Sequence, residues 1–374
     1  MDKFMQPINV TKSFLPPVNE FKYYIDKIWD SNWLTNNGEF HNEFEKEIEN
    51  YLKVSYCTLF CNGHLALDIA IKALKLKGEV ITTPFTFAST THAITMNGLL
   101  PRFCDISMDD YNIDVSKIEK LINENTCAII PVHVFGSPCN VYEIERISKK
   151  YKIPVIYDAA HCFGVEIGGE AIGIFGDISM ISFHATKVFN SIEGGVLTYS
   201  DEKLKYKLNC LKNFGITGPE TVEMIGMNAK MNEFQAAMGL LNLKYIEKEI
   251  NERKTVTNRY KRGLKELEGI RVLKENNNVK YNYSYFPILV DEKKVSCDRD
   301  LIYERLKEFN VFTRKYFYPI VTEYECYRDK YSTADTPNAK YVSDRILTLP
   351  IYGSLTDYEV DKICNLIKKI ICNS

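Results

Sequence analysis

The sequence predicts an α/β protein in which helices cover both faces of a mostly parallel sheet, followed by a smaller C-terminal α/β domain. Between about residues 54 and 200, short apolar, β-branched runs alternate with helical stretches, a pattern typical of βαβ units. A second, shorter alternation follows after about residue 245. The chain has 374 residues, 45% of them hydrophobic, which is enough for two cores. We therefore expect a large domain over residues 1–245 and a small domain over residues 246–374.

The first expected element is a helix over residues 21–29, because apolar residues recur there at helical spacing after the start signal Pro16-Pro17. The stretch WLTNNG at 33–38 reads as a loop. In the large domain the predicted strands are 80–83, 127–134, 155–157, 179–183 and 196–199, and the predicted helices include 65–74 and 141–151. A long helix is then expected from about residue 231 past residue 250, followed by strand 285–290, helix 301–309, strand 311–317 and a terminal helix over 357–371.

The bulk properties exclude several classes of function. The formal net charge is −2, from 47 basic and 49 acidic residues, so no strong field favours nucleic acid or anionic lipid. The N-terminus lacks the pattern of a signal peptide, and no apolar run is long enough to span a bilayer. The 11 cysteines form no CxxC pair. We expect a reduced, cytoplasmic protein without a bound metal.

Chemistry is expected where strands end, because ligands of open parallel sheets bind outside the carboxyl ends of the strands. The first such segment is Cys61-Asn62-Gly63-His64, which opens the predicted helix 65–74. A glycine-containing turn at a helix N-terminus presents free backbone N–H groups and the positive end of the dipole, which suits a phosphate. An Asn-Gly turn that only caps the helix would look the same.

The second segment follows the strand 155–157 and places Asp158, Ala159, Ala160 and His161 at its end. The two small alanines suggest that something bulky packs close by. The plainer alternative is that Asp158 caps the next turn.

The third segment places Lys187 after the strand 179–183. An unpaired ammonium is costly to bury, so such a lysine either pairs with a carboxylate or acts as an amine nucleophile of lowered pKa. A surface lysine in a loop is the alternative.

The fourth segment, TPFTF at 83–87, could present an aromatic face to a flat ligand, although such residues usually belong to the core. A phosphate seat, an aromatic platform, an acid and a strand-end lysine are together what a pyridoxal-phosphate (PLP) enzyme needs. The phosphate anchors the cofactor, the ring stacks, the carboxylate keeps the ring nitrogen protonated and the lysine forms the Schiff base.

With these four segments, the sequence resembles the DegT/StrS group of fold-type-I, PLP-dependent sugar aminotransferases. The resemblance covers nearly the whole chain, from residue 33 to residue 353. Its specific blocks are TTPFTFAST (82–90), PVHVFG (131–136), YDAAHCFG (157–164), SFHATKVFNSIEGG (182–195) and GMNAKMNEFQAA (226–237).

The resemblance implies that Lys187 binds PLP covalently and shuttles the proton. It further implies that Asp158 pairs with the ring nitrogen, that His161 lies near the ring hydroxyl and that Phe87 stacks on the ring.

For the cofactor phosphate, the resemblance implies Gly63, His64 and Ser182, together with Asn228 from a neighbouring subunit, and hence a homodimer with shared sites. Some relatives carry histidine instead of the lysine and dehydrate the sugar, so the lysine here favours transamination. The sequence departs from the family at Lys230, where arginine is frequent, and at Asn140, where aspartate is frequent.

Within the group, the chain looks most similar to enzymes that make dTDP-4-amino-4,6-dideoxy-D-glucose from dTDP-4-keto-6-deoxy-D-glucose and L-glutamate, for an O-antigen. Arg314, Tyr316 and Tyr318 in RKYFYP are candidates for contact with the sugar nucleotide, or else form a domain interface. A 3-keto-sugar aminotransferase is the close alternative. Two further alternatives are a non-catalytic regulatory or assembly protein of the same fold and an unrelated doubly wound enzyme in which Lys187 is structural.

Overall fold

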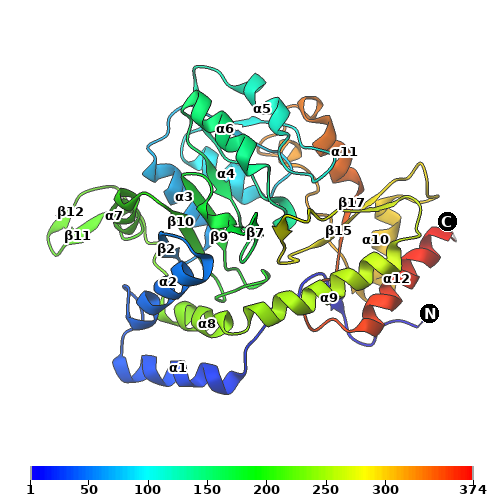
Figure 1. The fold of residues 1–374 in the computed structure, drawn as a ribbon, viewed down its shortest axis with the longest axis horizontal. Coiled ribbons are helices and arrows are strands. Elements are labelled where there is room, and N and C mark those ends of the chain that lie inside the picture. The colour runs from blue at the N-terminus through cyan, green and yellow to red at the C-terminus, as the bar shows by residue number, and fades with distance from the viewer. Residues whose placement is uncertain (1, 373–374) are drawn as a thin grey trace.

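The computed structural model describes residues 2–372, and its centre is a large sheet (Figure 1). A four-stranded part, in the order β2-β10-β9-β6, continues into a three-stranded part, β4-β3-β5, through isolated bridges between Ile129 and Val155 and between Val132 and Asp158. The strands are β2 (Tyr56–Phe60), β3 (Glu79–Thr82), β4 (Leu100–Phe103), β5 (Thr126–Ile129), β6 (Ile156–Asp158), β9 (Ile178–Ser182) and β10 (Gly195–Tyr199).

Strand direction agrees with the prediction of a mostly parallel sheet, which is confirmed. Strand β3 is parallel to both β4 and β5, and β6 is parallel to β9, with Asp158 opposite Met180. Within the described part of this large sheet, only β10 runs antiparallel to both of its neighbours. The carboxyl ends of β3, β6 and β9 therefore lie along one edge of the sheet.

Helices cover both faces of this sheet, because its strands are apolar on both sides. Successive residues alternate between two cores: Tyr157 belongs to the core under α2, α6 and α8, whereas Ile156 belongs to the core under α3, α4 and α7. The helices are α1 (Val18–Ser31), α2 (Glu39–Leu52), α3 (Gly63–Ala73), α4 (Ala88–Met96), α5 (Val115–Leu121), α6 (Val141–Tyr151), α7 (Glu202–Leu211), α8 (Glu233–Leu243) and α9 (Ile246–Leu264).

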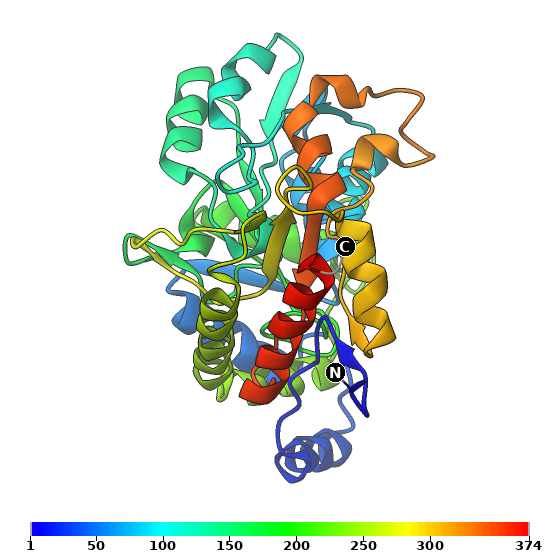
Figure 2. The same cartoon turned by 90° about the vertical axis from the view of Figure 1, so that its right-hand side faces the viewer.

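The C-terminal part has its own antiparallel sheet, β13-β15-β17, and its own core. Its elements are β13 (Ile270–Val272), β15 (Phe286–Val290), α10 (Arg299–Glu308), β16 (Val311–Phe312), α11 (Pro337–Arg345), β17 (Ile346–Leu349) and α12 (Asp357–Cys372). The N-terminal strand β1 (Ile8–Asn9) pairs in parallel with β16, so the start of the chain lies against this part (Figure 2). The boundary near residue 245 stays a prediction.

The prediction of a single long helix from residue 231 is wrong, because the structure has two helices there, α8 and α9. The backbone N–H groups of Lys244 and Tyr245 bond to the carbonyls three residues earlier, those of Leu241 and Asn242, rather than four residues earlier as in an α-helix. Tyr245 is the N-cap residue of α9, with φ −110° and ψ −7°, and its hydroxyl bonds to Glu20 on α1. The break lets α8 pack on α1 and α2 while α9 extends toward α12 (Figure 1).

Two predicted strands are shorter than expected. The strand expected over 127–134 ends at Ile129, because Pro131 has no N–H for the ladder, and Phe135 takes a left-handed φ of 59°. The strand expected over 311–317 ends at Phe312; Arg314 still pairs with Thr348 before the chain turns.

The remaining strands form two small antiparallel sheets, β14-β7-β8 and β11-β12. These strands are β7 (Glu166–Ile167), β8 (Glu170–Ala171), β11 (Ile216–Gly218), β12 (Thr221–Val222) and β14 (Val279–Lys280). Among the helices of residues 2–372, none combines the length and apolar character that crossing a membrane would require.

Candidate active site

The turn before α3 forms a compact seat. The side-chain oxygen of Asn62 caps the helix by accepting the N–H of Leu65 at 2.8 Å, whereas the N–H groups of Gly63 and His64 have no acceptor among the described residues. A Cβ on Gly63 would lie 3.2 Å from the Cβ of Ser182. The seat and the end of β9 therefore touch, and free N–H groups at a helix start suit an anion.

His64 and Gly195 fix this seat from two sides. The Nδ1 of His64 lies 2.9 Å from the hydroxyl of Ser89 on α4. Gly195, the first residue of β10, packs so closely that a Cβ there would lie 2.7 Å from the backbone nitrogen of Gly63. The seat is thus held between α4 and β10.

Asp158 ends strand β6 and is only 5% exposed. Its Oδ2 accepts a hydrogen bond from the hydroxyl of Thr90 at 2.6 Å, and its Oδ1 accepts the N–H of Ala160 at 3.1 Å. Burial raises the pKa of Asp158, and these two hydrogen bonds and the charge of Lys187 oppose that rise. The sequence interpretation missed Thr90, because a threonine inside a helix gives no local signal of such a contact.

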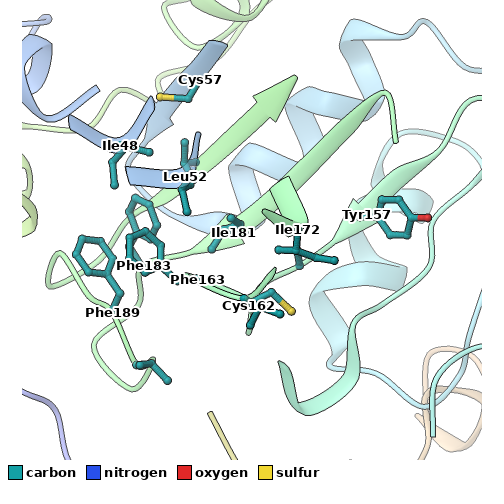
Figure 3. Packing of buried hydrophobic residues seen from close by; sticks show 14 of the residues in the cluster. Ile48, Leu52, Cys57, Tyr157, Cys162, Phe163, Ile172, Ile181, Phe183 and Phe189 are labelled. Atoms are coloured by element: carbon teal, nitrogen blue, oxygen red, sulfur yellow. The ribbon is translucent and has the colours of Figure 1, made fainter. Parts of the chain in front are cut away.

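Lys187 lies in the loop between β9 and β10. Phe183 and Phe189, one on each side of Lys187 in the loop, lie in the core, where Phe189 stacks on Phe163 with ring centroids 4.0 Å apart (Figure 3). The amide of Ser191 also bonds to the carbonyl of Phe183 at 2.9 Å. Core packing and a backbone hydrogen bond therefore hold the loop that carries Lys187 in place.

The ammonium of Lys187 is crowded and unpaired. Burial lowers its pKa to about 8, against the charges of Asp158 and Tyr316, which raise it. Within residues 2–372 it forms no ion pair, and the ring of Tyr285 lies beside it, with its centroid 5.9 Å from Nζ. A partly neutral amine of this kind can act as a nucleophile and as a base.

Three aromatic rings enclose the site beside Lys187. Tyr285 lies edge-on to His161, with centroids 4.8 Å apart, and Tyr316 lies 5.7 Å from Tyr285. Tyr285 and Tyr316 come from the C-terminal part of the chain and pack against a cluster that also contains Phe85 and Phe135, so both parts of the chain contribute to one site. The sequence did not indicate Tyr285 as a site residue, because its neighbours His161 and Lys187 are distant from it in the chain.

His161 is 7% exposed, and its Nδ1 is buried with no hydrogen-bond partner among the described residues. Burial, followed by the charge of Lys187, lowers the pKa of His161 well below its usual value, so the imidazole is neutral. A buried ring nitrogen without a partner is uncommon and fits a site that receives a polar ligand.

Phe87 stands at the start of α4, where it is the N-cap residue and 60% exposed. One residue earlier, the hydroxyl of Thr86 lies 2.8 Å from that of Thr90. The same turn therefore presents an aromatic face and contacts Asp158 through Thr90.

Asn228 is exposed and accepts a hydrogen bond from the ammonium of Lys230 at 3.0 Å. The carbonyl of the intervening residue, Ala229, accepts the N–H of Cys61 at 2.9 Å. The structure thus ties the segment that carries Asn228 to the phosphate seat of the same chain. Its expected role toward a second subunit stays a prediction.

The three residues of RKYFYP that are candidates for contact with the sugar nucleotide do not all lie at the site. Tyr316 lies beside Tyr285 at the site, and Arg314 is exposed with its guanidinium 5.6 Å from the ring of Tyr316. Tyr318 instead lies under the guanidinium of Arg299 on α10, at 4.6 Å.

These residues fit a flat, phosphate-bearing aldehyde cofactor such as PLP. Gly63 leaves room at a helix N-terminus, Lys187 offers an unpaired amine, and His161 has an orphan ring nitrogen. Residues 2–372 contain no grouping of three or more His, Cys, Asp or Glu side chains that could hold a metal ion.

Comparison with known proteins agrees with this geometry. Residues 18–368 match the model of the DegT/DnrJ/EryC1/StrS aminotransferase family. The chain is 44% identical to a dTDP-4-amino-4,6-dideoxy-D-glucose transaminase of Escherichia coli, over 96% of this chain and 98% of the relative. It is 41% identical to a protein of the same name from Shigella dysenteriae, over 98% and 99% of the two chains.

Among solved structures, the fold superimposes with a TM-score of 0.94 on DesI, crystallised in the presence of its TDP-sugar product. The two chains are 32% identical, and the match covers 99% of this chain and 94% of the other.

Proposed function

Because the chain belongs to the DegT/DnrJ/EryC1/StrS aminotransferase family, we propose that it transfers the amino group of L-glutamate to C4 of dTDP-4-keto-6-deoxy-D-glucose. The product would be dTDP-4-amino-4,6-dideoxy-D-glucose. The observation that carries the proposal is the full-length similarity to two transaminases named for this product. Use of the product in an O-antigen and a cytoplasmic location stay predictions.

The cofactor is pyridoxal 5′-phosphate, as the family and the residues of the site indicate. Bound PLP supplies an electron sink for the charge that develops when a carbon–hydrogen bond next to the amino nitrogen breaks. Gly63, His64 and Ser182 would hold its phosphate at the N-terminus of α3, and Phe87 would cover its ring.

Three side chains would act on the cofactor and the substrate. The carboxylate of Asp158 would accept a hydrogen bond from the protonated ring nitrogen, and His161, which is neutral, would lie by the ring hydroxyl. Lys187 would hold the cofactor and move one proton at the reacting carbon in each half-reaction. A pKa of about 8 keeps part of its amine neutral near neutral pH.

Tyr316 and Arg314 would contact the sugar nucleotide. Tyr316 lies near Lys187, and Arg314 is exposed beside it. A guanidinium at the mouth of the site suits a diphosphate. Tyr318 would contribute less, since it packs on Arg299.

The enzyme would work as a homodimer in which Asn228 reaches the phosphate of the partner's site. The hairpin β11–β12, before Asn228, projects from the molecule (Figure 1). Val222 is 67% exposed and Ile225 is 96% exposed. Apolar side chains gathered on a projecting segment are typical of an interface with another chain.

The test is turnover of the PLP-loaded protein with L-glutamate and a set of dTDP- and GDP-linked 4-keto and 3-keto sugars. We expect the dTDP-4-keto sugar to react best and NMR to locate the new amine at C4. An amine at C3, or a preference for another nucleotide, would refute the substrate assignment while leaving the transamination intact. No turnover of any keto sugar would refute the function.

A further inference from the structure

Thr90 donates the direct side-chain hydrogen bond to Asp158, over 2.6 Å between two buried oxygens. We propose that Thr90 is a positioning residue, whose hydroxyl holds the carboxylate of Asp158 ionised and oriented for the ring nitrogen of the bound cofactor. The inference rests on the proposed function, in which Asp158 pairs with that nitrogen.

The surroundings of Asp158 make this hydrogen bond important. The carboxylate is 5% exposed, and burial favours its protonated form. Two neutral donors, Thr90 and the N–H of Ala160, bond to it directly, and Lys187 is the charged group that acts on it within the described residues. When Lys187 becomes neutral, those two hydrogen bonds are the remaining protein contacts that favour the carboxylate.

A second hydroxyl extends this hydrogen bond into a chain, and the carboxylate sets the direction of the chain. Thr86 lies 2.8 Å from the hydroxyl of Thr90. An ionised carboxylate accepts only, so the single hydrogen of Thr90 points to Asp158 and Thr86 must donate to Thr90. The three groups form one chain of hydrogen bonds that ends on Asp158, and such chains strengthen their members.

The same turn of the chain links this hydrogen bond to the cofactor face. Thr86 precedes Phe87, and the amide of Thr90 bonds to the carbonyl of Phe87 at 3.3 Å. The residue expected to cover the ring and the residue that bonds to Asp158 are therefore fixed relative to each other at the start of α4.

Thr91 provides a matched control. It is as completely buried as Thr90, on the same helix, but its hydroxyl has no hydrogen-bond partner among the described residues. Thr90→Val and Thr91→Val make the same change of shape and polarity in the same helix, and only the first removes a bond to Asp158.

The experiment loads each full-length variant with PLP labelled with ¹⁵N in the ring and measures the ¹⁵N chemical shift, the PLP dissociation constant and kcat. In Thr90→Val we expect a shift toward unprotonated ring nitrogen and kcat lower by about tenfold to a hundredfold, the effect of one hydrogen bond to a charged group. Thr91→Val and Thr90→Ser should resemble the wild type. If Thr90→Val does not fold, Thr90→Ala removes the hydroxyl without adding bulk.

A ring nitrogen that stays protonated in Thr90→Val, with kcat equal to that of Thr91→Val, would overturn the proposal. Asp158→Asn separates this failure from failure of the proposed function. If Asp158→Asn changes the ¹⁵N shift and Thr90→Val does not, only the role of Thr90 is wrong. If Asp158→Asn changes neither shift nor rate, the assigned role of Asp158 is wrong, and the inference on Thr90 falls with it.

Discussion

Asp158 ends strand β6 and Lys187 follows the adjacent parallel strand β9, and the carboxylate affects the protonation of the amine. Burial lowers the pKa of Lys187 to about 8, and the charge of Asp158 limits that decrease. The two residues are separated enough to form no ion pair within residues 2–372, so the amine stays available. One side chain thus adjusts the protonation of the other across the space in which the cofactor is expected.

This coupling predicts how PLP binding depends on pH. The neutral amine attacks the aldehyde, so the rate at which the apoprotein captures PLP should rise about tenfold per pH unit below pH 8 and level off above it. Because the Asp158 charge raises the pKa of Lys187, Asp158→Asn should move the midpoint to lower pH. Stopped-flow absorbance measures both curves. A midpoint near the ordinary 10.5, or a move to higher pH in Asp158→Asn, contradicts this account.

Removal of the Lys187 amine should abolish covalent capture. We expect Lys187→Ala to give no borohydride-stable PLP adduct by mass spectrometry and no detectable product, while circular dichroism stays that of the wild type. Lys230→Ala is the control, since its ammonium bonds to Asn213 and Asn228 beside the phosphate seat, and it should keep the adduct. An adduct that persists in Lys187→Ala would reassign the lysine.

A shared site predicts complementation between two inactive chains. In a heterodimer of Lys187→Ala and Asn228→Ala, one site lacks both groups and the other has its own Lys187 and borrows Asn228. Assayed at limiting PLP, because one lost hydrogen bond costs only about 1.5–3 kcal/mol, the isolated heterodimer should recover about half of the wild-type activity. If Asn228 serves its own chain, every site carries one lesion and activity stays at the parental level.

The close approach of Gly195 to Gly63 predicts that a single methyl group disrupts the phosphate seat. In Gly195→Ala the new Cβ would lie 2.7 Å from the backbone of Gly63, so backbone must shift. We expect a loss of roughly 1–3 kcal/mol in unfolding free energy and weaker PLP binding, measured by urea denaturation and PLP titration. Gly218→Ala, whose Cβ would lie 3.6 Å from its nearest neighbour, should change neither. Unchanged PLP affinity in Gly195→Ala would show that the seat tolerates movement.

The sequence was sufficient to predict those parts of the site that follow from local pattern. Asp158 and Lys187 stand at strand ends, and parallel strands bring their carboxyl ends together, so their proximity follows from the fold class. The contact of Tyr285 with Lys187 did not follow, because these residues lie in different parts of the chain and no periodicity relates them. Pro131 did offer a signal for the early end of β5, whereas the break at Tyr245 depends on packing against α1.

Helix α9 joins the two halves of the molecule mechanically. Its first turns place Ile246 and Ile250 in the core beneath the main sheet, and its later turns place Val256, Tyr260 and Leu264 in the C-terminal core. A helix shared in this way loses support at one end when either core opens, so the melting of one core lowers the stability of the other. Heating should therefore give one cooperative transition for the chain rather than two separate ones.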